Sequence, residues 1–395
     1  MTMIPVEQAR QIISNNIQPL QPVEIPLSIA FNHALAEDVF STIDAPPFPQ
    51  SAMDGYAFRF EDLQHQPLTI EGEMAAGATV ESFLQPRYAM RIFTGAPVPA
   101  NADTVVMLEK TTVKDKQLFI EDDMLEQGLN VRPRGSEIGI GKLALSKGTV
   151  LSPAATGFLA GMGATHVKVF THPAIHLIVT GNELQQPGKA LHYGQVYESS
   201  SMMLSGVLRQ LHFSVGNIVF VQDDVAALTN ALQTSLQEAD VVLLTGGVSA
   251  GDYDFVIKAA TTCGVRQLFH KIKQRPGKPL FFGMLQSKVV FGLPGNPSSV
   301  LTCFYEYVWD ALLQLASLPN KKRKYHLPLA SAYSKKAGLT HFLKGKIVGD
   351  EVMPLTAQES YRLSSFAVAD CLIVLGEDET DFNKGDIVEV HILPQ

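Results

Sequence analysis

The spacing of hydrophobic residues changes several times along the chain and predicts regions of different structural class. Apolar residues recur at helical spacing over residues 6–17, and residues 28–40 are expected to form a second helix. Residues 68–137 contain short apolar runs separated by Gly and Pro, which predicts a small all-β region. From residue 174 apolar runs alternate with helical patterns, and after residue 324 strand-like runs return.

These patterns predict a multidomain protein of the α/β plus β class. Its centre is expected to be a doubly wound parallel-sheet domain formed by residues 173–318. Residues 1–43 and 140–172 are expected to form an extended helical linking domain, which carries an inserted small β domain at residues 44–139. Residues 319–395 are expected to form a C-terminal β-barrel.

The stretch ADVVLLTGGVSAGDYD, residues 239–254, changes character twice within a few positions. It begins as a β-branched apolar run typical of a strand buried on both faces, and then becomes a loop of small residues that includes Gly246, Gly247 and Ser249. Backbone N–H groups of such a loop can face an anion, and a carboxylate such as Asp254 beside a phosphate favours a bridging Mg²⁺. For this loop taken alone, a tight turn that binds nothing is the alternative.

Other strands of the same region also end in polar or Gly/Pro-rich loops, namely residues 180–183, 223–224 and 294–299. Ligands bind outside the C-terminal ends of parallel strands, so these loops are expected to meet at one edge of the sheet. In the last loop Asn296 is a plausible helix cap with Pro297 at the first helical position, which would leave the N–H groups of Ser298 and Ser299 free to face an anion. Glu183 is alternatively an ordinary carboxylate at a helix N-terminus.

Composition narrows the classes of ligand and compartment. The chain has 395 residues, 46% apolar and 18% charged, and a net charge of -8, which argues against a nucleic-acid-binding protein. Its three cysteines are far apart and indicate neither disulfides nor a zinc site. No leader or membrane segment is predicted, so a cytoplasmic protein is expected. An anionic ligand would need the basic segment HKIKQRPGKP at residues 270–279, for which a solvated loop is the alternative.

Longer motifs resemble one family. They are D-A-P-P-F-x-x-S-A-M-D-G-Y-A at 44–57, F-T-G-A-P-x-P at 93–99, T-G-N-E-L at 180–184, T-G-G-V-S-x-G-D-Y-D at 245–254, and P-G-K-P with L-P-G-N-P between 276 and 297. In these the chain resembles molybdopterin molybdenumtransferases, the MoeA and gephyrin E-domain family. The resemblance implies insertion of molybdate into adenylylated molybdopterin with release of AMP, assisted by Mg²⁺, in a homodimer.

The resemblance also implies roles for individual residues. The catalytic group would be Asp54, Glu183, Asp223, Asp254 and Lys271, with Asp223 and Asp254 as the metal ligands. The residues that bind the pterin substrate would be Thr94, Arg132, Glu137, Thr180, Gly246, Gly247, Ser249 and Lys278. The residues that bind molybdate would be Lys271, Arg275, Pro294, Pro297, Ser298, Lys344 and Ser360.

The chain departs from the family pattern at four of these or neighbouring positions. Arg275 stands where the family commonly has Lys, Lys344 and Leu339 stand where Arg is common, and Asn182 stands where Asp is usual. Two other functions stay open: a molybdopterin adenylyltransferase-like enzyme and a non-catalytic scaffold of the gephyrin type. The extra β regions argue against the first, and the acidic and basic motif residues argue against the second.

Overall fold

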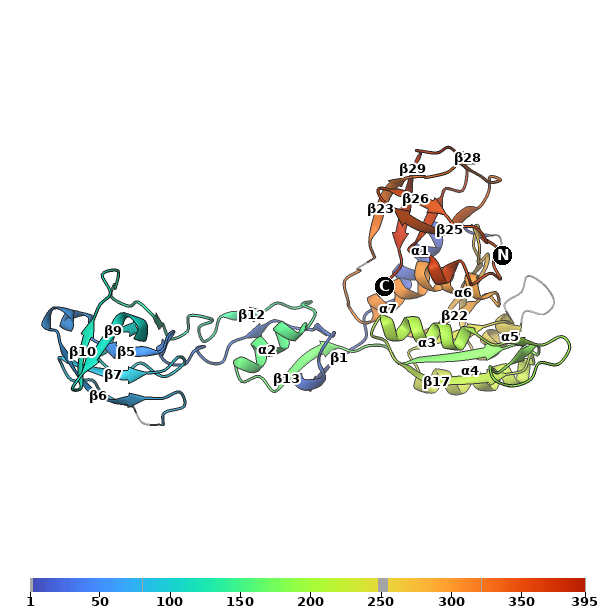
Figure 1. The fold of residues 1–395 in the computed structure, drawn as a ribbon. Coiled ribbons are helices and arrows are strands. Elements are labelled where there is room, and N and C mark those ends of the chain that lie inside the picture. The colour runs from blue at the N-terminus through green and yellow to red at the C-terminus, as the bar shows by residue number, and fades with distance from the viewer. Residues whose placement is uncertain (1–2, 80, 248–254, 321, 395) are drawn as a thin grey trace. The chain divides into compact units, whose positions relative to one another are not determined.

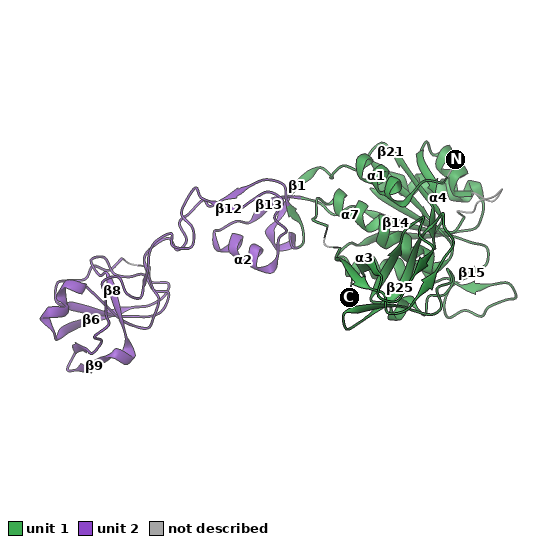
Figure 2. Cartoon of the chain, turned by 90° about the horizontal axis from the view of Figure 1, so that it is seen from above, with its two compact units in different colours: residues 1–23, 32–34, 170–395 green, residues 24–31, 35–169 purple. Residues whose placement is uncertain are grey.

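The computed structural model describes residues 3–79, 81–247, 255–320 and 322–394 (Figure 1). The chain divides into two compact units, which Figure 2 colours separately. Unit 1 contains residues 1–23, 32–34 and 170–395, and unit 2 contains residues 24–31 and 35–169. The predicted limits of the four domains stay a prediction.

A six-stranded sheet forms the centre of unit 1, in the order β17-β14-β18-β22-β21-β19. The first four strands are parallel, whereas β21 and β19 run antiparallel to their neighbours. The predicted α/β class is therefore confirmed, but the sheet is mixed: only Gln286 and Ser287 separate β21 from β22, too few residues for the crossover that parallel strands need. The strands are β14 (Ile175–Thr180), β17 (Val215–Val221), β18 (Val241–Thr245), β19 (Arg266–Lys271), β21 (Pro279–Leu285) and β22 (Lys288–Leu293).

Helices cover both faces of this sheet because alternate residues of its central strands point to opposite sides. Val241 and Leu243 of β18 join one core, and Val242 and Leu244 join the other. Figure 1 shows α3 and α4 on opposite faces. The first core includes α1 (Val6–Asn16), α3 (Ser200–Gln210), α6 (Pro297–Cys303), a π-helical turn (Phe304–Val308) and α7 (Trp309–Leu315); the second includes α4 (Val225–Glu238) and α5 (Phe255–Thr262).

The C-terminal part of unit 1 is a second sheet in the order β20-β25-β27-β29-β23, with β26 beside β25. This sheet has its own core and confirms the predicted C-terminal β region. Its first strand, β20, belongs to the basic segment and pairs Arg275 with His341. The strands of this sheet are β20 (Gln274–Arg275), β23 (Lys324–Pro328), β25 (Thr340–Val348), β26 (Glu351–Pro354), β27 (Cys371–Leu375) and β29 (Ile387–Ile392). Two separate two-stranded sheets are formed by β15 (Leu184–Gln185) and β16 (Val196–Tyr197), and by β24 (Tyr333–Ser334) and β28 (Asp381–Phe382).

Unit 2 contains a six-stranded sheet with a core of its own, in the order β8-β5-β7-β6-β10-β9. Its strands are β5 (Gly55–Phe58), β6 (Leu68–Met74), β7 (Tyr88–Ile92), β8 (Thr104–Met107), β9 (Thr111–Lys114) and β10 (Gln117–Ile120). Shorter strands of this unit are β3 (Val39–Phe40), β4 (Gln50–Ser51), β11 (Val131–Arg132) and β12 (Leu143–Leu145), while β1 (Pro22–Pro26), β2 (Ala34–Leu35) and β13 (His166–Phe170) include residues of both units.

Two local predictions in this part of the chain have different outcomes. The helix α2 (Pro153–Gly161) begins as expected, since the Ser152 hydroxyl accepts a hydrogen bond from the Ala155 N–H at 3.2 Å. The helix predicted over residues 28–40 is wrong. The N–H groups of Leu35 and Ala36 bond to the carbonyls of Thr149 and Lys168, so contacts distant in sequence outweigh local helical spacing. Within the described ranges, no helix is both long and apolar enough to span a membrane.

Candidate functional site

A cavity of about 900 Å³ lies at the C-terminal ends of the central strands of unit 1. Thr180 ends β14, Gly246 follows β18, and residues 294–297 follow β22; all of them line the cavity. The parallel pairing of these three strands brings their ends to one edge, as the sequence predicted. The proposed cradle residue Ser249 and the carboxylate Asp254 lie outside the described residues.

Position 246 requires glycine because the ends of two strands pack closely there. Its φ is +84°, and a β-carbon at this position would lie 2.0 Å from the carbonyl oxygen of Thr180. Any other residue would therefore push the loop away from β14. The adjacent Gly247 has a φ of +63° but does not line the cavity.

Asp223 lies beside this edge, at the end of β17, and is held by the T-G-N-E-L loop. Its carboxylate accepts hydrogen bonds from the Thr180 hydroxyl at 2.6 Å and from the Asn182 N–H at 3.4 Å. The Asn182 side-chain oxygen in turn accepts the Asp223 N–H at 3.1 Å. Glu183 lines the cavity and precedes β15, so its alternative interpretation as a helix N-terminal carboxylate is wrong.

The basic segment forms another wall of the cavity and is fixed from behind by Gln274. The Gln274 amide donates to the carbonyls of Pro276 and Gly277 at 3.0 and 3.1 Å, and its oxygen accepts the Tyr307 hydroxyl. Gly277 has a φ of +84°, and a β-carbon there would lie 2.6 Å from the Cys303 sulfur. Gln274 is buried, so the turn that carries Arg275 is anchored to the core.

Arg275 and Lys278 are exposed on this wall. Neither side chain has a hydrogen bond or an ion pair within the described part of the chain. The two cations are thus available to an anion in the cavity. Lys271, at the end of β19, is half-buried and does not line the cavity.

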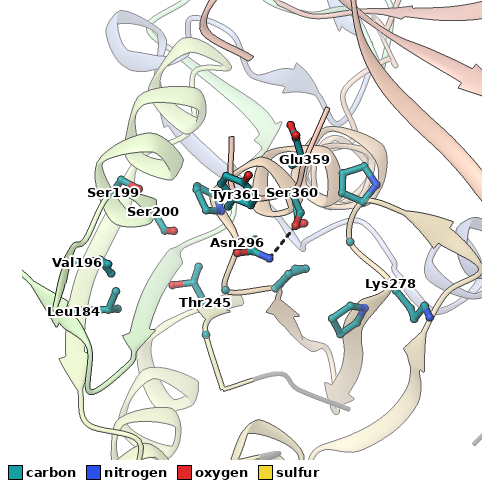
Figure 3. A pocket seen from close by; sticks show the side chains of 18 of the residues that line it. Leu184, Val196, Ser199, Ser200, Thr245, Lys278, Asn296, Glu359, Ser360 and Tyr361 are labelled. Atoms are coloured by element: carbon teal, nitrogen blue, oxygen red, sulfur yellow. Dashed lines mark hydrogen bonds between the residues drawn. The ribbon is translucent and has the colours of Figure 1, made fainter. Parts of the chain in front are cut away.

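A loop of the C-terminal sheet, residues 357–362, closes the cavity from a further side (Figure 3). The Asn296 side chain donates to the Ser360 hydroxyl at 3.0 Å, and the Ser298 N–H donates to the Ser360 carbonyl at 3.2 Å. The expectation that the Ser298 N–H would be free for an anion is therefore wrong. The Ser298 hydroxyl, by contrast, is fully buried and has no hydrogen-bond partner in the described chain.

Lys344, expected to bind molybdate, does not line the cavity. Its side chain is 1% exposed, and its ammonium group points to backbone carbonyls of the 357–362 loop. Pro294, Pro297 and Ser360 do line the cavity, as does Leu339. Sequence reasoning missed Gln274 and Tyr361; Gln274 had a usable signal, since it lies within the basic P-G-K-P segment.

Four of the predicted residues belong to unit 2. Asp54 accepts hydrogen bonds from the Thr94 N–H at 2.7 Å and from the Thr94 hydroxyl at 2.8 Å, and these bonds lower the pKa of the Asp54 carboxyl. Arg132 lies in β11 and is exposed. Glu137 is exposed and its N–H bonds to the Ala45 carbonyl at 2.9 Å.

The described residues only partly fit a Mg²⁺ ion. Mg²⁺ prefers carboxylate, phosphate and water oxygens in octahedral geometry. Asp223 offers one such carboxylate, but the described ranges contain no group of three or more His, Cys, Asp or Glu side chains that could hold a metal. A Mg²⁺ site at this edge would therefore need a bound phosphate or Asp254.

Comparison with known families covers nearly the whole chain. Residues 4–163 match the MoeA N-terminal region (domain I and II), residues 176–314 match the probable molybdopterin binding domain, and residues 326–393 match the MoeA C-terminal region (domain IV). The fold and the strand-end cavity thus belong to a MoeA-type protein of molybdenum cofactor biosynthesis.

Individual relatives sharpen this assignment. The chain is 32% identical to the molybdopterin molybdenumtransferase of Haemophilus influenzae, over 98% of both chains, and 30% identical to that of Staphylococcus aureus, over 98% of this chain and 95% of the relative. Two solved structures of the molybdopterin biosynthesis MoeA protein of Pyrococcus horikoshii superpose with TM-scores of 0.83 and 0.78, at 30% and 26% identity, covering 99% of this chain and 99% and 100% of theirs. The chain belongs to the molybdopterin molybdenumtransferase family.

Proposed function

We propose that this protein inserts molybdate into adenylylated molybdopterin and releases AMP. The observation that carries the proposal is the cavity at the ends of β14, β18 and β22, with Arg275 and Lys278 exposed on its wall and unpaired among the described residues. The transferase names of the relatives support the same reaction. The protein is proposed to act in the cytoplasm, without nucleic acid or membrane partners.

The charge distribution gives a physical reason for the two cations. The whole chain has a net charge of -8, and molybdate is a dianion that must approach a substrate already carrying phosphate. A local pair of cations in a recessed site raises the local concentration of such an anion despite the overall charge. Arg275 also presents a planar fork of donors, which can give two parallel hydrogen bonds to an oxyanion.

We assign the remaining roles by position. Thr180, Glu183 and Gly246 would contact the substrate at the strand ends, and Asp223 together with Asp254 would hold Mg²⁺ against its phosphates. Mg²⁺ bound there would supply charge neutralisation at the phosphate bond that breaks. The Thr180 hydroxyl fixes the Asp223 carboxylate and so orients it in advance.

Asp54, Thr94, Arg132 and Glu137 are proposed to complete the site from a second copy of the chain in a homodimer. Light scattering at micromolar concentration should then give twice the mass of one chain. A monomer with full activity would contradict this assembly.

The reaction is tested by incubating the protein with adenylylated molybdopterin and Mg²⁺, with and without molybdate. We expect AMP release that depends on molybdate. Adenylylation of molybdopterin from ATP would favour the adenylyltransferase alternative, AMP release without molybdate would be plain hydrolysis of the adenylate and would contradict the proposed insertion, and no turnover would favour a scaffold.

The metal assignment has its own variants. Asp223→Asn and Asp254→Asn keep the side-chain shape but remove the charge that holds a hard cation. Both should abolish Mg²⁺-dependent AMP release while the unfolding midpoint stays close to that of the wild type. Unchanged turnover in either variant would move the metal site away from that residue.

A further inference from the structure

Lys344 is a buried lysine whose partners are backbone carbonyls. Its ammonium group donates to the carbonyls of Ala357 at 2.9 Å, Arg362 at 3.1 Å and Glu359 at 3.5 Å. A buried charge is costly unless hydrogen bonds replace its lost water, and these carbonyls supply them. Burial also lowers the pKa of Lys344, in keeping with a group withdrawn from solvent.

The backbone of Lys344 holds the same loop. Gln358 accepts the Lys344 N–H at 3.0 Å and donates to the Lys344 carbonyl at 2.8 Å. The loop has no helix or strand between Pro354 and Phe366 to fix it otherwise. The Ser365 hydroxyl adds one further bond, to the Ala357 carbonyl at 2.7 Å. Lys344 thus attaches this segment through both its side chain and its backbone.

The loop held in this way forms part of the cavity wall. Gln358, Glu359, Ser360 and Tyr361 line the cavity, and Ser360 bonds to both Asn296 and Ser298 of the opposite wall. The position of Ser360 therefore depends on a lysine that does not itself reach the cavity.

We propose that Lys344 is a positioning residue, which holds residues 357–362 against Asn296 and Ser298 so that the cavity is shaped for molybdate. It acts through the loop and makes no contact with the anion. The inference rests on the proposed function, because the effect on molybdate use requires that reaction. The effect on the loop does not require it.

Lys335 provides a matched control in the same part of unit 1. Its side chain is also buried, and its ammonium group donates to the carbonyls of Leu339 at 3.0 Å and Glu377 at 3.2 Å. Lys335→Met therefore removes a comparable buried charge but leaves the bonds to the 357–362 loop in place. Any change in exchange of residues 357–362 that both variants share therefore does not come from the loss of the Lys344 bonds.

The test measures hydrogen exchange of the amides of residues 357–362 together with AMP release. In Lys344→Met we expect loop exchange to rise by about tenfold or more, because three bonds from a charged donor are lost. The molybdate concentration for half-maximal AMP release should rise by a similar factor, and the rate at saturating molybdate should stay within about twofold. Lys335→Met should leave loop exchange unchanged.

Lys344→Gln separates positioning from direct contact and serves if Lys344→Met does not fold. Its amide has no charge and is one atom shorter than the lysine side chain, but it can still donate to one or two of the carbonyls, so it should recover part of the loop protection and of the molybdate dependence. Equal losses of molybdate affinity in the Gln and Met variants, with wild-type loop exchange, would overturn the proposal. Curves that overlay the wild type would overturn it too.

The proposed function can fail independently of this inference. A wild-type protein without molybdate-dependent AMP release would contradict the function. Loop exchange would then decide alone whether Lys344 holds the loop.

Discussion

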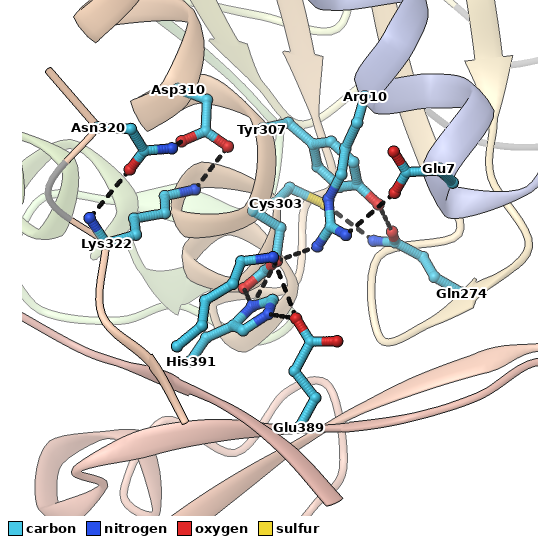
Figure 4. Close-up of polar contacts among 12 residues, drawn as sticks. Glu7, Arg10, Gln274, Cys303, Tyr307, Asp310, Asn320, Lys322, Glu389 and His391 are labelled. Carbon is cyan, nitrogen blue, oxygen red and sulfur yellow. Dashed lines mark hydrogen bonds and ion pairs between the residues drawn. The ribbon is translucent and has the colours of Figure 1, made fainter. Parts of the chain in front are cut away.

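Two charged clusters of unit 1 differ in how their charges are balanced. On the cavity side, Arg275 and Lys278 are exposed and have no partner among the described residues. In the other cluster, Arg10, Glu306 and His391 form a paired network in which Glu306 and His391 are buried and Arg10 is 24% exposed (Figure 4). Charges that are buried and paired hold segments together, whereas charges left exposed at a cavity remain available to a ligand.

The buried network joins segments that are far apart in the sequence. Arg10 of α1 bonds to Glu306 of the π-helical turn at 2.6 Å, and His391 of β29 bonds to the same carboxylate at 2.9 Å. Burial alone would raise the pKa of Glu306, but the hydrogen bond from His391 and the charges of His391, Lys322 and Arg10 outweigh it and lower the pKa to about 2. Glu306 therefore carries its charge at neutral pH.

The largest effect is expected from Glu306→Gln. Removal of one partner leaves the charges around it buried without compensation, which costs about 3–5 kcal/mol of unfolding free energy. Denaturant unfolding measures this loss. Glu37→Gln is the control, because Glu37 is exposed and its ion pair with Lys168 should contribute less than about 1 kcal/mol. Equal losses in the two variants would contradict the structural role given to burial.

Acid should weaken the same network. The pKa of Glu306 is about 2 in the folded chain and has its ordinary value of 4.5 in the unfolded chain. A depressed folded pKa contributes stability that is complete above pH 4.5 and is lost as the pH falls toward 2, with a size on the order of 3 kcal/mol. As the pH is lowered from 4.5 toward 2, the unfolding free energy of Glu306→Gln should therefore fall less steeply than that of the wild type. If the two curves of unfolding free energy against pH were parallel, Glu306 would not be the source of the loss of stability in acid.

A smaller effect is expected where the core supports the cavity wall. Gly277→Ala would place a β-carbon 2.6 Å from the Cys303 sulfur and force a φ of +84° on a residue with a side chain. We expect a loss of about 1–3 kcal/mol in unfolding free energy and a higher molybdate concentration for half-maximal AMP release. Gly264→Ala is the control: its φ is +77°, but the nearest atom lies at 3.8 Å. If both variants lost the same stability, the clash at Gly277 would be irrelevant.

The sequence predicts the strands better than their directions. The apolar runs of β21 and β22 were recognisable, but a buried antiparallel strand and a buried parallel strand have the same pattern. The direction follows from the two-residue turn at Gln286, which the pattern did not reveal. The strand-end loops could be predicted because parallel strands with helical connections end at one edge of the sheet.

The roles of single polar residues were harder to predict, because their partners come from distant segments. In the sequence, Lys344 is a charged residue within a strand, and its burial depends on a loop more than ten positions further on. The N–H of Ser298 was expected to be free, but Ser360 of the C-terminal region accepts it. Such bonds depend on how segments pack, which hydrophobic spacing does not encode.

The central claim is that an exposed cation without a partner at the cavity captures molybdate, whereas a paired cation beside it does not. Arg275→Ala tests it directly, with Lys273→Ala as the control, because Lys273 pairs with Glu377 at 2.6 Å. A charge-assisted hydrogen bond contributes roughly 1.5–3 kcal/mol, so Arg275→Ala should raise the molybdate concentration for half-maximal AMP release by about tenfold or more. Lys273→Ala should leave that concentration nearly unchanged. An Arg275→Ala curve that overlays the wild type, or equal shifts in both variants, would contradict the account.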